Sequence, residues 1–253
     1  MERRDANPSP LDLSIVVPAF EEEQSLPILH REIGEALQGT GLGYELLFVD
    51  DGSGDRTPEV LRDLARTDPR VRVLRQTPNR GQSAALAAGW NAARAPVVVM
   101  MDADLQNDPA DIPELVERLE GWDVVSGIRV ERRDTWVRRL SSRIANAVRR
   151  RVTGDSATDV GCTLRACRTE LLRRVPVFDG MHRFLPALLE MDGARMTEVP
   201  VRHRARRFGT AKYGIRNRLG RGILDLFGVW WLQRRWVGRR TVTEVTDGDG
   251  TQS

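Results

Sequence analysis

Residues 96–104 read PVVVMMDAD, and this stretch decides the fold that the rest of the chain is expected to adopt. The apolar run 96–101 is rich in β-branched residues, which predicts a buried strand. The strand is expected to end at Asp102, and a second carboxylate, Asp104, follows two positions later. Two like charges this close repel each other at a partly desolvated strand end, so the pair is unfavourable for stability unless it binds something positive.

A divalent cation would remove the repulsion between Asp102 and Asp104. Carboxylates are hard oxygen ligands that suit Mg²⁺ or Mn²⁺, and a cation held there can also bridge to a diphosphate. Pairs of aspartates separated by one residue also occur in ordinary turns, where both side chains face water. The position directly after an apolar strand is what favours a metal site over such a turn.

Similar apolar runs precede this strand and alternate with helix candidates. The expected strands and helices lie, in order, at residues 13–18, 21–37, 44–49, 57–65, 71–74 and 82–93. The helix at 57–65 is expected to start with Thr57 as its N-cap and Pro58 as its first residue. Strands that are apolar throughout are buried on both faces. Their alternation with helices predicts an α/β protein whose mostly parallel sheet has helices on both sides.

Three polar loops, at residues 18–23, 50–55 and 102–106, follow three of the predicted strands. Ligands of open parallel sheets bind beside the carboxyl ends of the strands, so we expect the three loops to meet at one site. Carboxylates in the second loop can accept hydrogen bonds from a base or from ribose hydroxyls. The alternative is structural, because acids in the first two loops could instead stabilise the starts of the helices that follow.

The second half of the chain has a less regular pattern. Its expected elements are helices at 113–119, 135–152 and 216–236 and strands at 123–126 and 197–201. The last of these helices carries an apolar stripe with tryptophans and is flanked by arginines, a combination typical of a helix that lies in a membrane interface. The alternative is that this helix packs on the core or on another subunit.

The composition limits the class of protein. A chain of 253 residues with 40% hydrophobic residues suits one folded domain, or one domain with an appendage. Its cysteines, Cys162 and Cys167, provide neither a disulfide framework nor a CxxC zinc motif. The first ten residues carry no apolar run, so we expect no secretory signal and a cytosolic protein. No stretch reaches the roughly 20 apolar residues that a membrane-spanning helix needs.

Charge is distributed unevenly along the chain. The net charge is +3, yet between Glu198 and Glu244 the only acidic residue is Asp225, while arginines recur. This asymmetry indicates an anionic partner such as a phosphate, a membrane surface or a nucleic acid. We expect no nucleic-acid partner, because the basic residues do not interleave with stacking aromatic residues in a recognisable module.

Four segments together resemble the family 2 glycosyltransferases, whose fold is the nucleotide-binding, Rossmann-like type called GT-A. The segments are SIVVPAFEEEQSL (14–26), ELLFVDDGSGDRT (45–57), NRGQSAALAAGWNAA (79–93) and VVVMMDADLQNDP (97–109). The resemblance covers at least residues 12–127. The DADLQ form is most similar to the branch of dolichol-phosphate mannosyltransferases and polyprenyl-phosphate glycosyltransferases. That branch usually has asparagine where Glu21 stands, which leaves Glu22 as the match for its ribose-contacting glutamate.

The resemblance implies roles for residues in the first half of the chain. Pro18, Glu22 and Asp51 would contact the nucleoside of a nucleotide-sugar donor. Asn79 and Gly81 match a turn at which the backbone approaches the donor. The residues implied to hold Mg²⁺ or Mn²⁺ and the donor diphosphate are Asp102, Asp104 and Gln106.

The second half carries shorter matches to the same branch. SGIRVERRD (126–134) is similar to an arginine-containing loop, and arginines suit bidentate contacts with phosphate. Taken alone, such a loop is more often simply solvated. Two further segments resemble the D-x-G-x-x-x-R and R-x-G-x-S-K patterns, and Asp134 and Asp159 are the candidates for an acid–base residue. The matching residues are Arg129, Arg133, Asp134, Asp159, Arg165, Arg207 and Lys212.

The implied activity is that of an inverting, metal-dependent hexosyltransferase. It would move a sugar from GDP-mannose or a UDP-sugar to a polyprenyl or dolichyl phosphate. A soluble sugar or metabolite as acceptor is the alternative. The protein would act at the cytosolic face of a membrane, bound to its surface or to a small membrane subunit. The expected organisation is a flexible N-terminus (1–11), the GT-A domain (12–212), an amphipathic helical segment (213–240) and a disordered tail (241–253).

Overall fold

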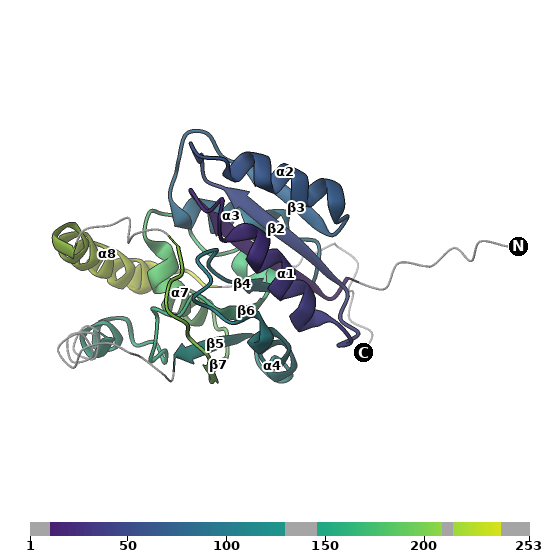
Figure 1. Cartoon of the computed structure of the whole chain (residues 1–253). Helices are drawn as coiled ribbons and strands as arrows, with labels where there is room; N and C mark the ends of the chain where they lie inside the picture. Colours follow the sequence, from purple (N-terminus) through teal and green to yellow (C-terminus); the bar gives the residue numbers. More distant parts are fainter. Residues whose placement is uncertain (1–10, 130–145, 209–214, 239–253) are drawn as a thin grey trace, which may run out of the picture.

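The apolar run of VVVM forms strand β4 (Val97–Met100), which lies at the middle of a seven-stranded sheet (Figure 1). The computed structural model describes residues 11–129, 146–208 and 215–238; for residues 215–221 it describes the backbone only. The other strands are β1 (Leu13–Ala19), β2 (Tyr44–Asp50), β3 (Val71–Arg75), β5 (Val124–Arg129), β6 (Arg165–Arg168) and β7 (Met196–Val201). The order in the sheet is β3-β2-β1-β4-β6-β5-β7, and every pairing is parallel except the two that β6 makes.

Helices cover both faces of this sheet, as the sequence predicted (Figure 1). The helices are α1 (Leu26–Leu37), α2 (Thr57–Thr67), α3 (Gln82–Ala92), α4 (Ile112–Arg118), α6 (Thr169–Leu172), α7 (Leu185–Met191) and α8 (Ile215–Arg235), with short 3-10 turns η1 (Pro109–Asp111) and η2 (Met181–Phe184). Side chains of α1, α2 and α4 pack on one face, and those of α3, α6 and α7 pack on the other. In β1, Ile15 and Val17 join the first layer while Val16 joins the second. The predicted α/β fold class, with a mostly parallel sheet, is therefore confirmed.

Two details at helix starts differ from the prediction. Helix α1 begins at Leu26, because residues 20–25 form a loop instead of continuing the expected helix from residue 21. Helix α2 has Arg56 at its N-cap position, so Thr57 is its first residue. The Thr57 hydroxyl does not cap α2; it accepts a hydrogen bond from the backbone N–H of Glu22 at 2.8 Å. The expected capping role of Thr57 was wrong because a neighbouring loop uses its oxygen.

Strand β6 was not predicted, and it is the one strand of the described sheet that runs opposite to the others. It lies between β4 and β5 and is antiparallel to both. Its four residues, RACR, begin and end with arginine, so they show neither an apolar run nor a two-residue alternation. The pairing of Met100 with Arg165 brings the start of β6 to the end of β4. Residues just before β6 consequently lie near Asp102.

Helix α8 confirms the predicted helix near the C-terminus. It lies beside α7 and extends away from the sheet (Figure 1). Val229 is buried against the domain, and Asp225 forms an ion pair with Arg183 at 2.9 Å. The Gln233 side chain donates a hydrogen bond to the Thr153 carbonyl at 2.8 Å, so one side of α8 is fixed to the domain. Among the described helices, none combines the length and the hydropathy that a bilayer crossing requires.

Parts of the predicted organisation lie outside the described residues. The flexible N-terminus is described only from residue 11, and the tail at 241–253 is not described. The basic helix expected at 135–152 is described from residue 146, and residues 146–153 are helical. The division of the chain at residues 212 and 240 stays a prediction.

Candidate active site

The loops after β1 and β2 are joined to each other at the carboxyl edge of the sheet. The backbone N–H of Asp51 donates to the Ala19 carbonyl at 2.9 Å, which continues the pairing of the two strands. The N–H of Glu21 donates to the Ser53 hydroxyl at 2.9 Å. Together with the bond from Glu22 to Thr57, these contacts confirm that the first two polar loops converge.

The predicted nucleoside residues of the β2 loop and of the turn before α3 lie together. Asp51 is buried, and its carboxylate accepts a hydrogen bond from the N–H of Arg80 at 2.8 Å. Gly52 has a φ of 78°, and a Cβ there would lie 2.9 Å from the backbone nitrogen of Asn79, so only glycine fits. The Asn79 side chain in turn accepts from the N–H of Gly81 at 3.2 Å. Asp51, Asn79 and Gly81 are thus neighbours, as expected.

Pro18 and Glu22 lie on the other side of this junction. Pro18 is the sixth residue of β1 and is paired in register with Val49 of β2. The Glu22 carboxylate accepts a hydrogen bond from the Ser25 hydroxyl at 2.7 Å. Both residues therefore stand at the edge where the sequence placed them, and their contact with a nucleoside stays a prediction.

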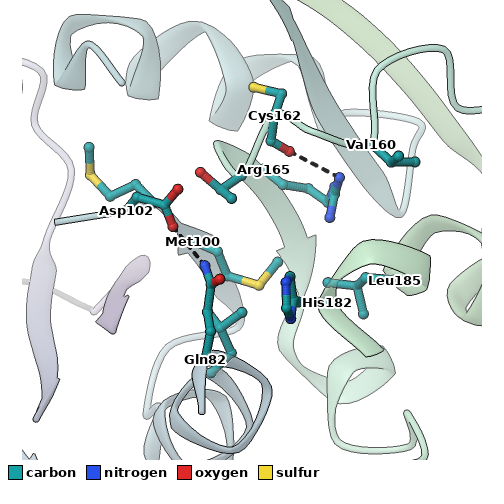
Figure 2. Close-up of a pocket in the computed structure, with 11 residues that line it drawn as sticks. Gln82, Met100, Asp102, Val160, Cys162, Arg165, His182 and Leu185 are labelled. Carbon is teal, nitrogen blue, oxygen red and sulfur yellow. Dashed lines mark hydrogen bonds between the residues drawn. The ribbon is translucent and has the colours of Figure 1, made fainter. Parts of the chain in front are cut away.

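Asp102 and Asp104 follow the end of β4 and are held by different partners. The Asp102 carboxylate accepts a hydrogen bond from the Gln82 side chain, at the start of α3, at 2.8 Å (Figure 2). Asp104 is buried; one of its oxygens accepts from the N–H of Gln106 at 3.1 Å. Its other oxygen forms an ion pair with Arg206 at 2.7 Å. The pair is therefore anchored from α3 on one side and from the segment after β7 on the other.

The environment of Asp102 disfavours its charged form. Burial and the neighbouring charge of Asp104 together raise the pKa of this carboxyl to about 7, although a hydrogen bond from Thr163 opposes the shift. An acid near neutrality at a strand end is typical of a functional site. A divalent cation would compensate both the burial and the repulsion.

The backbone of two of these loops is strained. Among the described residues, Glu21 and Leu105 are the non-glycine residues with positive φ, at 54° and 63°. Side chains other than glycine rarely adopt this conformation, and it persists where the surroundings impose it. Leu105 lies directly after Asp104 and is buried in the core, which holds the turn in place. Strain at both loops fits a site whose geometry is maintained for binding.

The residues present fit a metal that binds together with a diphosphate. Among the described residues, no group of three or more His, Cys, Asp and Glu side chains could hold a metal by itself. Asp102 and Asp104 would supply two carboxylates, and Mg²⁺ is commonly held by one or two carboxylates plus substrate phosphates and water. The Gln106 side chain lies 3.5 Å from the His203 ring nitrogen and from the Arg204 carbonyl. Its expected role as a third ligand stays a prediction.

Arg129 and Asp159, both expected to take part in catalysis, form a bidentate ion pair. The Arg129 Nε and Nη2 donate to the two carboxylate oxygens of Asp159 at 2.9 and 2.8 Å. Asp159 is buried and comes from the loop before β6, whereas Arg129 ends β5. Gly161 lies so close to Arg129 that a Cβ there would overlap the guanidinium. This arrangement favours a positioning role for Asp159, which fixes the direction of the Arg129 side chain.

The remaining predicted residues are only partly described. Arg133, Asp134 and Lys212 lie outside the described residues. Arg207 is exposed in the segment that follows β7. The proposed phosphate contacts of these residues therefore stay predictions.

A pocket lies beside Asp102 (Figure 2). Gln82 and Asp102 line one side of it, and His182 and Arg165 line the other. Arg165 is buried; it donates to the Ser126 hydroxyl at 3.1 Å and to the Cys162 carbonyl at 3.3 Å. The pocket therefore has an acidic end and a basic end, which suits a polar ligand with anionic groups.

Sequence reasoning did not find Gln82, Thr163 and Arg206 as site residues. Gln82 follows directly after Gly81, and an amide at the first residue of a helix that faces the site was a signal within reach. Arg206 adjoins the predicted Arg207, but only the structure shows which of the two reaches Asp104. His182 bonds to the Ser83 hydroxyl at 2.8 Å and also lines the pocket.

A mostly parallel sheet with a polar loop after β2 and paired carboxylates after β4 is the arrangement of the GT-A class of glycosyltransferase folds. Glucosyl-3-phosphoglycerate synthase from Mycobacterium tuberculosis, crystallised with phosphoglyceric acid, has a similar fold. Its TM-score is 0.65 at 24% identity, over 88% of this chain and 80% of that one. A structure of the same protein with Mn²⁺, uridine diphosphate and glucosyl-3-phosphoglycerate gives a TM-score of 0.64 at 23% identity, over 88% and 80%.

The chain belongs to glycosyl transferase family 2, whose model matches residues 14–175. It is 40% identical over 205 residues to an undecaprenyl-phosphate 4-deoxy-4-formamido-L-arabinose transferase of Edwardsiella ictaluri, covering 80% of this chain and 63% of the relative. It is also 40% identical over 230 residues to a dodecaprenyl-phosphate galacturonate synthase of Rhizobium johnstonii, covering 88% and 68%. The chain thus spans less than two thirds of the length of the first of these relatives.

Proposed function

We propose that this chain transfers a sugar from a nucleotide-sugar donor to a polyprenyl phosphate in a reaction that requires a divalent cation. The observation that carries the proposal is the Asp102–Asp104 pair at the end of β4, beside the loop that holds Asp51. Similarity to two relatives named for polyprenyl-phosphate substrates supports the acceptor.

The donor would lie along the carboxyl edge of the sheet. Pro18, Glu22 and Asp51 would contact the nucleoside, and the protein backbone at the turn of Asn79 and Gly81 would approach the donor. The relatives are named for 4-deoxy-4-formamido-L-arabinose and galacturonate, so we favour a modified pentose or a uronic acid over mannose as the transferred sugar. GDP-mannose stays an untested prediction, and a UDP-sugar is the donor we would examine first.

The chemistry follows from the charges at the site. A cation bound to Asp102 and Asp104 would neutralise the leaving diphosphate. The acceptor phosphate is already ionised near neutral pH, so its oxygen can attack the anomeric carbon without a strong general base. What the protein must supply is position, and Arg129, which Asp159 orients, would hold the acceptor phosphate. Attack opposite to the departing diphosphate would invert the configuration of the sugar.

Helix α8 would bring the protein to the membrane that contains the acceptor. Large apolar side chains are exposed on α8 and just after it, and these are Ile223, Leu224, Phe227, Trp231 and Val237. The Arg234 guanidinium lies 4.2 Å from the ring centre of Trp230, next to this surface. Tryptophan, arginine and an apolar surface suit the headgroup layer of an anionic membrane. A small membrane subunit as partner stays a prediction.

The test is a transfer assay with purified protein, Mn²⁺ and a panel of radiolabelled nucleotide sugars. Undecaprenyl phosphate in detergent should become labelled, and free monosaccharides should not. Asp104→Asn should lower the rate by about a hundredfold or more, because the leaving diphosphate would lose its cation. Asp63→Asn, which changes an exposed aspartate of α2, should leave the rate unchanged. Transfer only to soluble acceptors, or full activity of Asp104→Asn in excess chelator, would contradict the proposal.

A further inference from the structure

The segment after β7, residues 202–208, is fastened to the domain by three arginines. Arg202 pairs with Asp111 at 2.7 Å, and Arg204 pairs with Glu32 at 2.6 Å. These two acids belong to η1 and α1. Arg206 pairs instead with Asp104, the second carboxylate of the proposed metal site. One of three similar contacts therefore reaches into the site while the others do not.

The position of Arg206 is the one expected of a cation bound at this site. Its Nη2 lies 2.7 Å from Asp104 Oδ2, within the range of a strong charge-assisted hydrogen bond. The positive charge of Arg206 also lowers the pKa of Asp102 against the effects of burial and of Asp104. The guanidinium thus already relieves part of the repulsion that a divalent cation would relieve.

A guanidinium and a divalent cation compete when they need the same carboxylate oxygen. Asp104 has two oxygens; one is bonded to the N–H of Gln106, and the other is bonded to Arg206. A metal ion alone would have to break the contact with Arg206 and leave its charge in a partly buried place, since only 33% of that side chain is exposed. A metal ion that arrives with a diphosphate brings oxygens to which the displaced guanidinium can bind.

We propose that Arg206 is an internal cation that occupies the Asp102–Asp104 site until a divalent metal and a nucleoside diphosphate bind together and displace it. The inference rests on the proposed function, because it concerns the same metal site. Arg206 makes metal binding depend on the nucleotide, and it is a positioning residue whose partner changes from Asp104 to phosphate. When Arg206 leaves Asp104, one of the three arginines that hold segment 202–208 to the domain loses its ion pair.

The test measures Mn²⁺ binding to the full-length protein by the electron paramagnetic resonance of free Mn²⁺. Arg206→Gln should bind Mn²⁺ alone about fivefold more tightly than the wild type, a change of the size that one partly exposed ion pair produces. With uridine or guanosine diphosphate present, the difference in Mn²⁺ affinity between Arg206→Gln and the wild type should become smaller or reverse. The variant lacks the guanidinium that, in the wild type, binds the diphosphate after it leaves Asp104. Arg206→Lys keeps a charge at this position and should give an intermediate affinity.

Arg204→Gln is the matched control. Arg204 lies two residues away, has a side chain that is similarly exposed at 32%, and pairs with Glu32 and Asp108. It should leave Mn²⁺ affinity unchanged. Equal affinity of wild type and a folded Arg206→Gln for Mn²⁺ alone, while both bind Mn²⁺ with a diphosphate, would overturn the role of Arg206 and spare the metal site. Failure of every variant to bind Mn²⁺ with any diphosphate would overturn both, and loss of transfer to polyprenyl phosphate alone would leave the inference standing.

Discussion

At the scale of single residues, Asp102 places an unfavourable buried charge at the proposed metal site. Asp102 has an ordinary pKa of 3.8, and burial with the neighbouring Asp104 raises it to about 7 in the folded protein. A carboxyl whose pKa is raised on folding destabilises the folded state at pH values above that raised pKa. The cost disappears as the pH falls towards the ordinary value, because the group is then protonated in both states.

The upward shift of the Asp102 pKa gives a prediction for the metal-free protein. Asp102→Asn should have a higher free energy of unfolding than the wild type at pH 8, and the difference should narrow as the pH falls from 7 to 5. Urea denaturation in the presence of a chelator measures the free energy of unfolding of the variant and of the wild type at each pH. Asp63→Asn, at an exposed site, should show no such trend. A difference that is the same at pH 5 and pH 8 would show that burial of the Asp102 charge does not oppose folding.

The residues of the site divide into those that sequence could predict and those that it could not. Asp51, Asp102 and Asp104 were accessible because each follows an apolar strand, and parallel strands place their carboxyl ends at one edge. Gln82, Thr163 and Arg206 approach the pair from 20 to about 100 residues away in the sequence. Which side chain covers such a distance depends on packing, which a local pattern does not contain.

At the scale of elements, the loop before β6 controls the direction of Arg129. A Cβ at Gly161 would overlap the Arg129 guanidinium, so Gly161→Ala should separate Arg129 from Asp159. Because the Asp159 carboxylate is buried, the loss of this partner should lower stability by about 1–3 kcal/mol. We expect a lower transfer rate with little change in nucleotide affinity.

The measurement for Gly161→Ala is steady-state kinetics together with calorimetric binding of the nucleoside diphosphate. Gly34→Ala, inside α1 and away from the site, is the control and should not reduce activity. Wild-type kinetics for Gly161→Ala would show that the Arg129–Asp159 pair does not contribute to transfer.

Strands with a long apolar run could be predicted from the sequence, whereas a short strand without such a run could not. The strands at β1, β2 and β4 have continuous apolar runs, and their bounds agree with the expectation to within about a residue or two. Strand β6 has four residues with arginine at both ends, and its pairing with β4 is what stabilises it. The start of α1 was misplaced because Glu21 adopts a positive φ that its residue type does not announce.

At the scale of the whole molecule, α8 is the element that we propose to bind the membrane. Phe227 and Trp231 are 62% and 58% exposed on this helix. Burying an aromatic side chain in an apolar layer is worth about 1.5–3 kcal/mol, so replacing both with serine should lower vesicle binding by more than about tenfold. Co-sedimentation with vesicles that contain or lack anionic lipid measures the effect.

The control for this prediction is Trp122→Ser. Trp122 is 37% exposed but lies between α4 and β5, away from α8. Its substitution should not alter vesicle binding. Retention of wild-type protein in the supernatant with every lipid composition would contradict the role of α8, as would unchanged binding of the Phe227→Ser/Trp231→Ser protein.

The reversed strand β6 also divides the sheet into two halves, which join where β4 pairs with β6. On one side, β1 to β4 form the parallel half that carries the predicted nucleoside loops and the Asp102–Asp104 pair. On the other side, the segments around β5, β6 and β7 carry Arg129, Asp159 and Arg206. Within the described sheet, the halves are joined only where β4 pairs with β6. We therefore expect the half with β5, β6 and β7 to diverge more readily than the half with the predicted nucleotide site. We expect an exchange of residues 146–208 between relatives to change which molecule receives the sugar more than which nucleotide is bound.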